Sequence, residues 1–190
     1  YKKVSEPKFR TLLPGFDADY MPVDCKDDAL FFVTNEGASN YALKRIGLNA
    51  PAKVATVIPE DGKNLLEGVG TAGGYLFASY LQDAQSQVRQ YDYDGRLVRT
   101  VELPAIGTVG GFDGEKEDTE LYYALSNYTS PATVYKYDIA SGASTLYKAP
   151  EVKFDPSRFT TEQVFFTSKD GTQVPMFITY RKDLKRDGKN

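Results

Sequence analysis

Histidine is absent from this chain of 190 residues, and cysteine occurs once, at position 25. The triads built on serine or cysteine need a histidine as general base, so no such triad exists within this chain. Histidine is also the commonest zinc ligand, and one thiol cannot complete a structural zinc site. A lone Cys25 also forms no internal disulfide, which leaves the compartment open between cytoplasm and bacterial periplasm. We expect Cys25 to be a small buried hydrophobe.

Basic charge and long apolar runs are also scarce. The formal net charge is −3 and the isoelectric point is about 5.1, whereas nucleic-acid binding requires a basic face that displaces counterions from phosphates. No apolar run approaches the ~20 residues that cross a bilayer. Helix-period stretches of ten or more residues are missing too, because glycine and β-branched residues interrupt each one. We therefore expect no nucleic-acid partner and no membrane span.

The residues that are abundant favour strands. Hydrophobic residues make up 41% of the chain, with 14 Tyr and 11 Phe among them. Tyr, Phe, Val and Thr suit a pleated, half-buried surface. The 16 Gly and 10 Pro lie between short apolar runs, as in all-β proteins with many turns.

Apolar positions recur at a spacing of about 45 residues. Three sets hold this period: Phe32, Phe77 and Tyr123; Leu43, Val88 and Val134; Ile46, Tyr91 and Tyr137. Four strands per unit at this period are typical of β-propeller blades. One such unit cannot bury both faces of its sheet, so each unit needs a neighbour on either side.

The predicted fold is therefore all-β: a partial β-propeller of about three four-stranded antiparallel blades, followed by a C-terminal hairpin. Residues 1–13 are interpreted as the outer strand of a preceding blade, on the apolar run Phe9 to Leu13. The blades span 14–60, 61–104 and 105–149, and a Pro-containing linker spans 150–163. The expected strands are 20–23, 29–34, 41–46, 53–58, 65–71, 75–81, 87–93, 96–103, 108–112, 120–126, 133–138 and 144–149.

Residues 164–190 do not continue the repeat. Val164 to Tyr180 (VFFTSKDGTQVPMFITY) predicts a β-hairpin around Asp170-Gly171, because Asp-Gly favours a two-residue turn. Pro175 cannot donate to a ladder and suits an edge. The polar tail after Tyr180 predicts a solvated turn that leads into a further domain.

Two motifs suggest chemistry that their surroundings do not support, and a third motif is missing. Ser5 and Lys8 match the S-x-x-K of serine acyl enzymes, but that motif needs a helix and Pro7 opposes one. Gly68 to Gly74 is glycine-rich without the Lys-Ser/Thr of a phosphate loop or a following helix; crowded backbones at a blade turn explain it better. No G-x-S-x-G nucleophile elbow occurs.

Three further polar groups are weighed in the same way. An acidic cluster could hold calcium, yet its order fits no known calcium loop and a solvated turn is favoured. Its residues are Asp113, Glu115, Glu117, Asp118 and Glu120. Asn127-Tyr128-Thr129 has the form of a glycosylation sequon. Asn35, Asn40 and Tyr41 are interpreted as turn residues. We assign no catalytic, cofactor-binding or metal-binding residue to this chain.

The C-terminal stretch VFFTSKDGTQVPMFITYRKDLKRDGKN resembles the segment of prolyl oligopeptidases where the β-propeller meets the α/β-hydrolase domain. Upstream, TNEGASNYALKRI and GGFDGEKEDTELYYALSNYTSPATVYKYD resemble the last blades of the same family. The resemblance covers essentially the whole chain. It implies a seven-bladed propeller above a hydrolase that cleaves short peptides after proline with a Ser-Asp-His triad located outside this chain.

On this resemblance the chain is a non-catalytic, substrate-gating part of a serine endopeptidase. Its expected partners are the hydrolase domain, the upstream blades and short proline-containing peptides. Two alternatives remain: a fragment of an oligopeptidase B-like or dipeptidyl-peptidase-like enzyme, and a stand-alone propeller that acts as a binding scaffold. Blades with uncovered faces would lead the isolated chain to self-associate or to be marginally stable.

Overall fold

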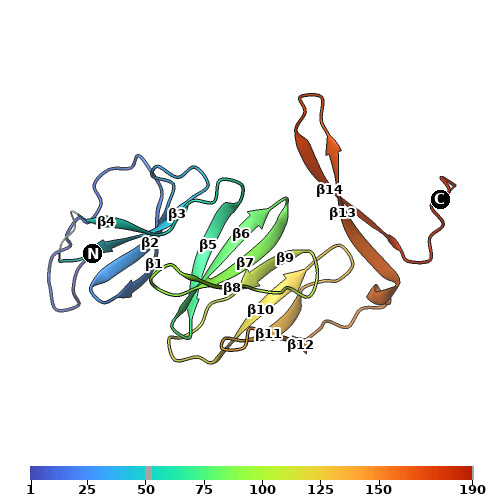
Figure 1. Cartoon of the computed structure of the whole chain (residues 1–190). Coiled ribbons are helices and arrows are strands. Elements are labelled where there is room, and N and C mark those ends of the chain that lie inside the picture. Colours follow the sequence, from blue (N-terminus) through green and yellow to red (C-terminus); the bar gives the residue numbers. More distant parts are fainter. Residues whose placement is uncertain (50–52, 190) are drawn as a thin grey trace.

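The structure, a computed structural model, describes residues 1–49 and 53–189. Three four-stranded sheets stand face to face in chain order, and a separate hairpin projects from the third sheet (Figure 1). The first sheet contains β1 (Tyr20–Lys26), β2 (Ala29–Thr34), β3 (Ala42–Gly47) and β4 (Val54–Ile58). The second contains β5 (Leu65–Ala72), β6 (Tyr75–Gln82), β7 (Gln85–Tyr91) and β8 (Leu97–Thr100). The third contains β9 (Thr108–Gly111), β10 (Glu120–Ser126), β11 (Thr133–Asp138) and β12 (Ser144–Lys148), and the hairpin contains β13 (Phe159–Thr167) and β14 (Gln173–Arg181).

Each sheet is an antiparallel meander whose strands follow one another along the chain. Short loops make this order possible, because two residues in the left-handed region match the twist of a hairpin. Asp27 and Asp28 adopt this conformation between β1 and β2, and Asp83 and Ala84 adopt it between β6 and β7. The partial propeller of three four-stranded blades and a hairpin is thus confirmed.

Most of the expected blade strands are present with ends shifted by one to three residues, and two expectations are wrong. The segment Phe9 to Leu13 forms no strand, and none precedes Tyr20 in the part of the chain that is described. Its backbone is instead tied locally, since Arg10 N donates to Tyr1 O. The hairpin begins at Phe159, five residues earlier than expected, so part of the predicted linker is strand.

The hairpin turn is also longer than a two-residue turn. Ser168 N donates to Thr172 O and Gly171 N donates to Ser168 O. Five residues, 168–172, separate the two strands. Because Ser168 and Thr172 are bonded to each other, the loop itself contains three residues, 169–171. Gly171 takes the left-handed position, with φ +87°. A turn followed by a left-handed glycine bulge is the usual three-residue-loop hairpin. The last residue of the predicted tail, Asn190, lies outside the described residues.

The core lies between the sheets. One cluster joins the first and second sheets, and a second joins the second and third sheets. In the second cluster Phe112 stacks on Tyr123 at 4.5 Å between ring centroids and also contacts Phe77 and Tyr137. The second sheet is therefore covered on both faces, as a propeller blade requires.

One of the three repeat sets is wrong by one residue. Phe77 packs toward the third sheet, whereas Tyr123 packs back toward the second sheet, so these two residues are not equivalent. Ala78, which packs toward the first sheet, occupies the position that corresponds to Tyr123. Because side chains alternate between faces, an error of one residue reverses the face. Phe77 and Ala78 are both buried. Because both faces of β6 are buried, the sequence alone does not show which of the two residues corresponds to Tyr123.

Cys25 is exposed, which corrects the expectation that it is buried. It lies near the end of β1, a strand that pairs only with β2. The one helical turn in the described residues is the 3-10 turn Pro156–Arg158. Within these residues no helix has the length and apolar character to cross a membrane.

Candidate functional site

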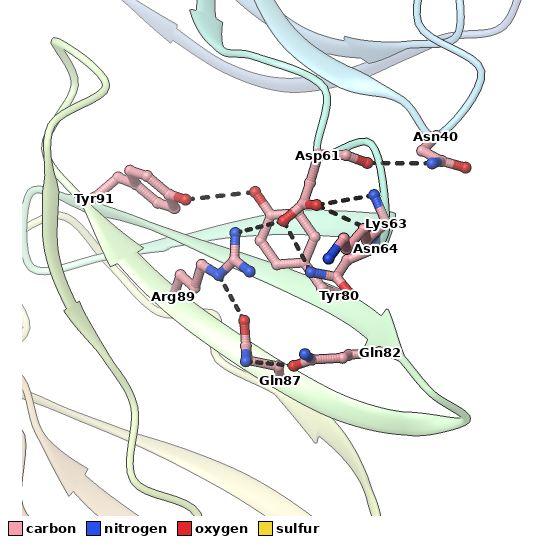
Figure 2. Close-up of polar contacts among 9 residues, drawn as sticks. All are labelled: Asn40, Asp61, Lys63, Asn64, Tyr80, Gln82, Gln87, Arg89 and Tyr91. Carbon is pink, nitrogen blue, oxygen red and sulfur yellow. Dashed lines mark hydrogen bonds and ion pairs between the residues drawn. The ribbon is translucent and has the colours of Figure 1, made fainter. Parts of the chain in front are cut away.

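The densest polar cluster joins the first and second sheets around Asp61, in the link between β4 and β5 (Figure 2). Its carboxylate accepts hydrogen bonds from Lys63 N at 3.1 Å and from the Asn64 side chain at 2.8 Å. Arg89 on β7 donates from Nη1 to the same carboxylate at 3.0 Å. Asn40, from the β2–β3 loop, donates from Nδ2 to the backbone oxygen of Asp61 at 3.1 Å. Three segments distant in sequence therefore meet at one acid.

These donors determine the charge of Asp61. Burial alone would raise its pKa, but hydrogen bonds from Lys63 N, Asn64 and Arg89 outweigh burial and lower the pKa to about 2. Asp61 is consequently ionised at neutral pH and its lone pairs are occupied. This acid is suited to holding chain segments together rather than to proton transfer, which requires a pKa near the working pH.

Arg89 completes the cluster on the face of the second sheet that packs toward the first. Its guanidinium lies 4.3 Å from the ring centroid of Tyr80, and its Nε donates to Gln87 Oε1 at 2.6 Å. Burial raises the pKa of Tyr80, and the neighbouring Tyr91 hydroxyl adds to this shift. Arginine suits this place because it can pair with a carboxylate and stack on a ring at once.

A second polar contact joins the second and third sheets. Gln90 is fully buried on β7. Its Nε2 donates to Ile139 O at 3.2 Å, and its Oε1 accepts from the Tyr137 hydroxyl at 2.9 Å. Arg99 on β8 adds a hydrogen bond from Nη2 to Ala140 O at 2.8 Å. Both interfaces between sheets are thus held by oriented polar contacts as well as by apolar packing.

The glycine-rich stretch lies where two backbones approach closely, as predicted. A Cβ at Gly70 would lie 2.4 Å from Phe112 O, and one at Gly73 would lie 2.5 Å from Asp118 O. Backbone hydrogen bonds use this proximity: Gly73 N donates to Glu115 O, and Gly114 N donates to Thr71 O. The glycines therefore allow the second and third sheets to pack.

Three of the five clustered acidic residues bind protein donors in the described structure. Asp113 accepts a hydrogen bond from Thr71 N at 3.1 Å, and Asp118 accepts one from Glu115 N at 2.7 Å. Glu120 pairs with Lys136 at 3.1 Å. Across the described ranges no group of three potential metal ligands lies together. The carboxylates stabilise a turn and its packing.

The remaining polar motifs shape loops, within one loop at Asn127 and through longer-range bonds to Asp19 at Asn35 and Tyr41. Asn127 Oδ1 accepts from Thr129 N and Ser130 N, which shapes the β10–β11 loop around the sequon. Asn35 Oδ1 accepts from Asp19 N at 2.8 Å. Tyr41, with φ +64°, donates its hydroxyl to Asp19 at 2.6 Å. Ser5 and Lys8 lie in a segment without helix.

Two adjoining pockets were not predicted from the sequence. Their volumes are about 310 and 300 Å³, and both are lined by Lys26, Asp27, Gly74 and Tyr93. The Lys26 ammonium lies 3.9 Å from the Tyr93 ring centroid, and the Tyr93 hydroxyl donates to Asp24 at 2.5 Å. Charges of both signs surround these pockets, with more acidic than basic residues in each lining. The local signal was the run of charged residues at the end of β1.

Stacked four-stranded meanders, joined by apolar clusters and polar contacts, define this chain as part of a β-propeller domain. The profile of the family described as "Prolyl oligopeptidase, N-terminal beta-propeller domain" matches residues 1–150. The chain belongs to this family.

Individual relatives agree. The prolyl endopeptidase of Elizabethkingia meningoseptica is 44% identical over 185 residues, and that of Dictyostelium discoideum is 31% identical over 189. These alignments cover 96% and 92% of this chain but 26% and 25% of the relatives. The chain thus spans about a quarter of their length.

Solved structures give the same result. A prolyl endopeptidase studied for its inter-domain dynamics superposes with a TM-score of 0.84 at 37% identity, over 98% of this chain and 28% of that chain. Apo prolyl oligopeptidase B from Galerina marginata superposes with a TM-score of 0.84 at 25% identity, over 93% of this chain and 26% of that one.

Proposed function

We propose that this chain is the non-catalytic, substrate-gating part of a serine endopeptidase that cleaves short peptides after proline. The observation that carries the proposal is the 44% identity to a prolyl endopeptidase over 96% of the chain. The chain has no histidine, so the general base of the triad must come from outside it. The α/β-hydrolase domain that would contribute the triad follows β14 in this proposal.

The contacts between the sheets support a propeller whose blades stay in place relative to one another. Asp61 with Arg89 joins the first two sheets, and Gln90 with Tyr137 joins the second and third. Breaking either contact would leave buried or half-buried polar groups unpaired, which costs free energy. In this proposal the sheets therefore stay together, and the propeller, set above the hydrolase domain, excludes large folded proteins.

The test is to determine the coding sequence around this chain, express the whole protein and assay three chromogenic peptides. A blocked peptide with proline before the scissile bond should be cleaved. A blocked peptide with arginine there tests the oligopeptidase B-like alternative, and a free amino-terminal X-Pro dipeptide tests the dipeptidyl-peptidase-like alternative. Preference for the arginine peptide would overturn the proline specificity, and preference for the free X-Pro dipeptide would overturn the endopeptidase assignment. No cleavage of any peptide would favour the binding scaffold.

A further inference from the structure

In the described structure, the hydrogen bonds and the ring contact that the β13–β14 hairpin makes with the sheets come from a single rung. Gln163 on β13 and Phe177 on β14 are direct cross-strand partners, so they lie at one level of the ladder. One of them contacts the second sheet and the other contacts a loop of the third sheet. The hairpin projects away from the three sheets (Figure 1).

Gln163 uses both ends of its amide. Its Nε2 donates to Asp83 O at 2.5 Å, and its Oε1 accepts from Gln85 Nε2 at 3.1 Å. Asp83 lies in the tight β6–β7 turn, where it and Ala84 both have positive φ. A turn of this kind is rigid because few other backbone conformations close it. The acceptor that Gln163 binds therefore has a defined direction.

Phe177 contacts the propeller through one ring. Its centroid lies 5.6 Å from that of Tyr128, at an interplanar angle of 41°. Tyr128 is 70% exposed and lies in the β10–β11 loop that Asn127 shapes. A pocket of about 260 Å³ remains beside the two rings, lined also by Ala84 and Ile106. The rings therefore meet at the surface and have space to separate.

For the hairpin residues Phe159–Arg181, these two hydrogen bonds and one ring contact are the polar and aromatic contacts with the three sheets in the described structure. Beyond the rung the side chains of Phe165, Phe166 and Met176 are 42 to 49% exposed. Because these polar and aromatic contacts all lie at one level of the hairpin, we expect its direction to depend on that level.

We propose that the Gln163–Phe177 rung is a positioning contact that sets the direction in which the hairpin leaves the propeller. Because Gln163 contacts the second sheet and Phe177 contacts a loop of the third, the two contacts together define one orientation of the hairpin. With either contact alone, the hairpin would be free to rotate about it. The contact is small and half-exposed, so it can also release. What it orients beyond β14 rests on the proposed function, but the direction of the hairpin itself does not.

The test is a distance measurement within this chain. Nitroxide labels are placed at the hairpin turn with Lys169→Cys and in the β7–β8 turn of the second sheet with Arg96→Cys, after Cys25→Ser removes the exposed native thiol. The labelled chain is diluted with unlabelled chain so that self-association adds no intermolecular distance. Double electron–electron resonance should then give one narrow distance distribution. Gln163→Glu keeps the acceptor for Gln85 but places an oxygen against the Asp83 carbonyl, and we expect loss of the single narrow peak.

Matched variants separate orientation from folding. Gln173→Glu makes the same chemical change near the hairpin turn, where the side chain bonds only Thr167, and should keep the narrow peak. Tyr128→Ala changes an exposed side chain of the propeller and should broaden the distribution as Gln163→Glu does, with an unchanged circular dichroism spectrum. A narrow peak retained in both Gln163→Glu and Tyr128→Ala would overturn the proposal.

The whole protein gives a second readout. Gln163→Glu should change kcat/KM for a long proline peptide relative to a short one, with an unchanged melting temperature, because orientation affects access more than chemistry. An unchanged ratio together with an altered distance distribution would restrict the role to the hairpin and overturn the link to gating. If no proline peptide is cleaved, the proposed function fails while the distance measurement still decides the positioning role.

Discussion

Gly95 offers the sharpest test of how the first two sheets meet. It lies in the β7–β8 turn with φ +82°, and its amide donates to Asp92 O. A Cβ built on Gly95 would lie 2.0 Å from Val57 O on β4. Gly95→Ala therefore places a methyl group where the backbone of the neighbouring sheet already lies.

Two costs add in Gly95→Ala. A left-handed conformation with a Cβ costs about 1–2 kcal/mol. Relief of the contact with Val57 O requires the sheets to separate locally, and overpacking of this kind costs about 1–3 kcal/mol. The expected loss is roughly 2–5 kcal/mol, a large part of the ~5–15 kcal/mol that stabilises a typical domain.

Urea unfolding followed by circular dichroism and tyrosine fluorescence measures this loss, since the chain has no tryptophan. Gly37→Ala and Gly171→Ala are the controls, because both glycines have positive φ and nothing lies within 4 Å of their built Cβ. These controls should lose only the conformational term of about 1–2 kcal/mol. Equal losses in Gly95→Ala and Gly37→Ala would refute the close approach of the sheets.

Three other outcomes are expected. Asp61→Asn should destabilise the chain by ~1 kcal/mol at pH 7, allowing for solvent screening. Because the pKa of Asp61 is lowered in the folded state, the greater stability of the wild type should disappear as the pH falls from about 4 toward 2. Gln90→Leu should lower stability by about 1–3 kcal/mol because it leaves the Tyr137 hydroxyl and Ile139 O unpaired. The isolated chain should self-associate through the outer face of the third sheet, where Tyr122 and Tyr147 form an exposed ring pair.

Each outcome has a control. Asp155→Asn, at an exposed turn, should lack the effect of Asp61→Asn at pH 7, and an equal effect would argue against the cluster around Asp61. Tyr137→Phe should cost less than Gln90→Leu, since Gln90 keeps its bond to Ile139 O; the reverse order would contradict the assigned bonds. Sedimentation velocity should show concentration-dependent association that Tyr122→Glu weakens, and a stable monomer at every concentration would contradict the exposed face.

Local patterns were enough for the strands of the repeat. The bounds of β2, β10 and β11 are those expected from the sequence, because short apolar runs between turn residues are a signal within one strand. Sequence resemblance also placed the chain in its family, which the profile match to residues 1–150 confirms. The strand predicted at Phe9 to Leu13 was wrong, because these strand-forming residues pair with no partner strand in the described structure.

The contacts that join separate segments were decided by the tertiary structure alone. Asp61 and Arg89 are 28 residues apart, and Gln163 lies 80 residues from Asp83. Neither pair has a motif, because such contacts depend on how sheets are placed in space. The side of the sheet that Phe77 faces was also decided by the tertiary structure, because a strand buried on both faces is apolar at consecutive positions. Periodicity therefore defines a blade, whereas packing between blades defines which side chains hold it to its neighbours.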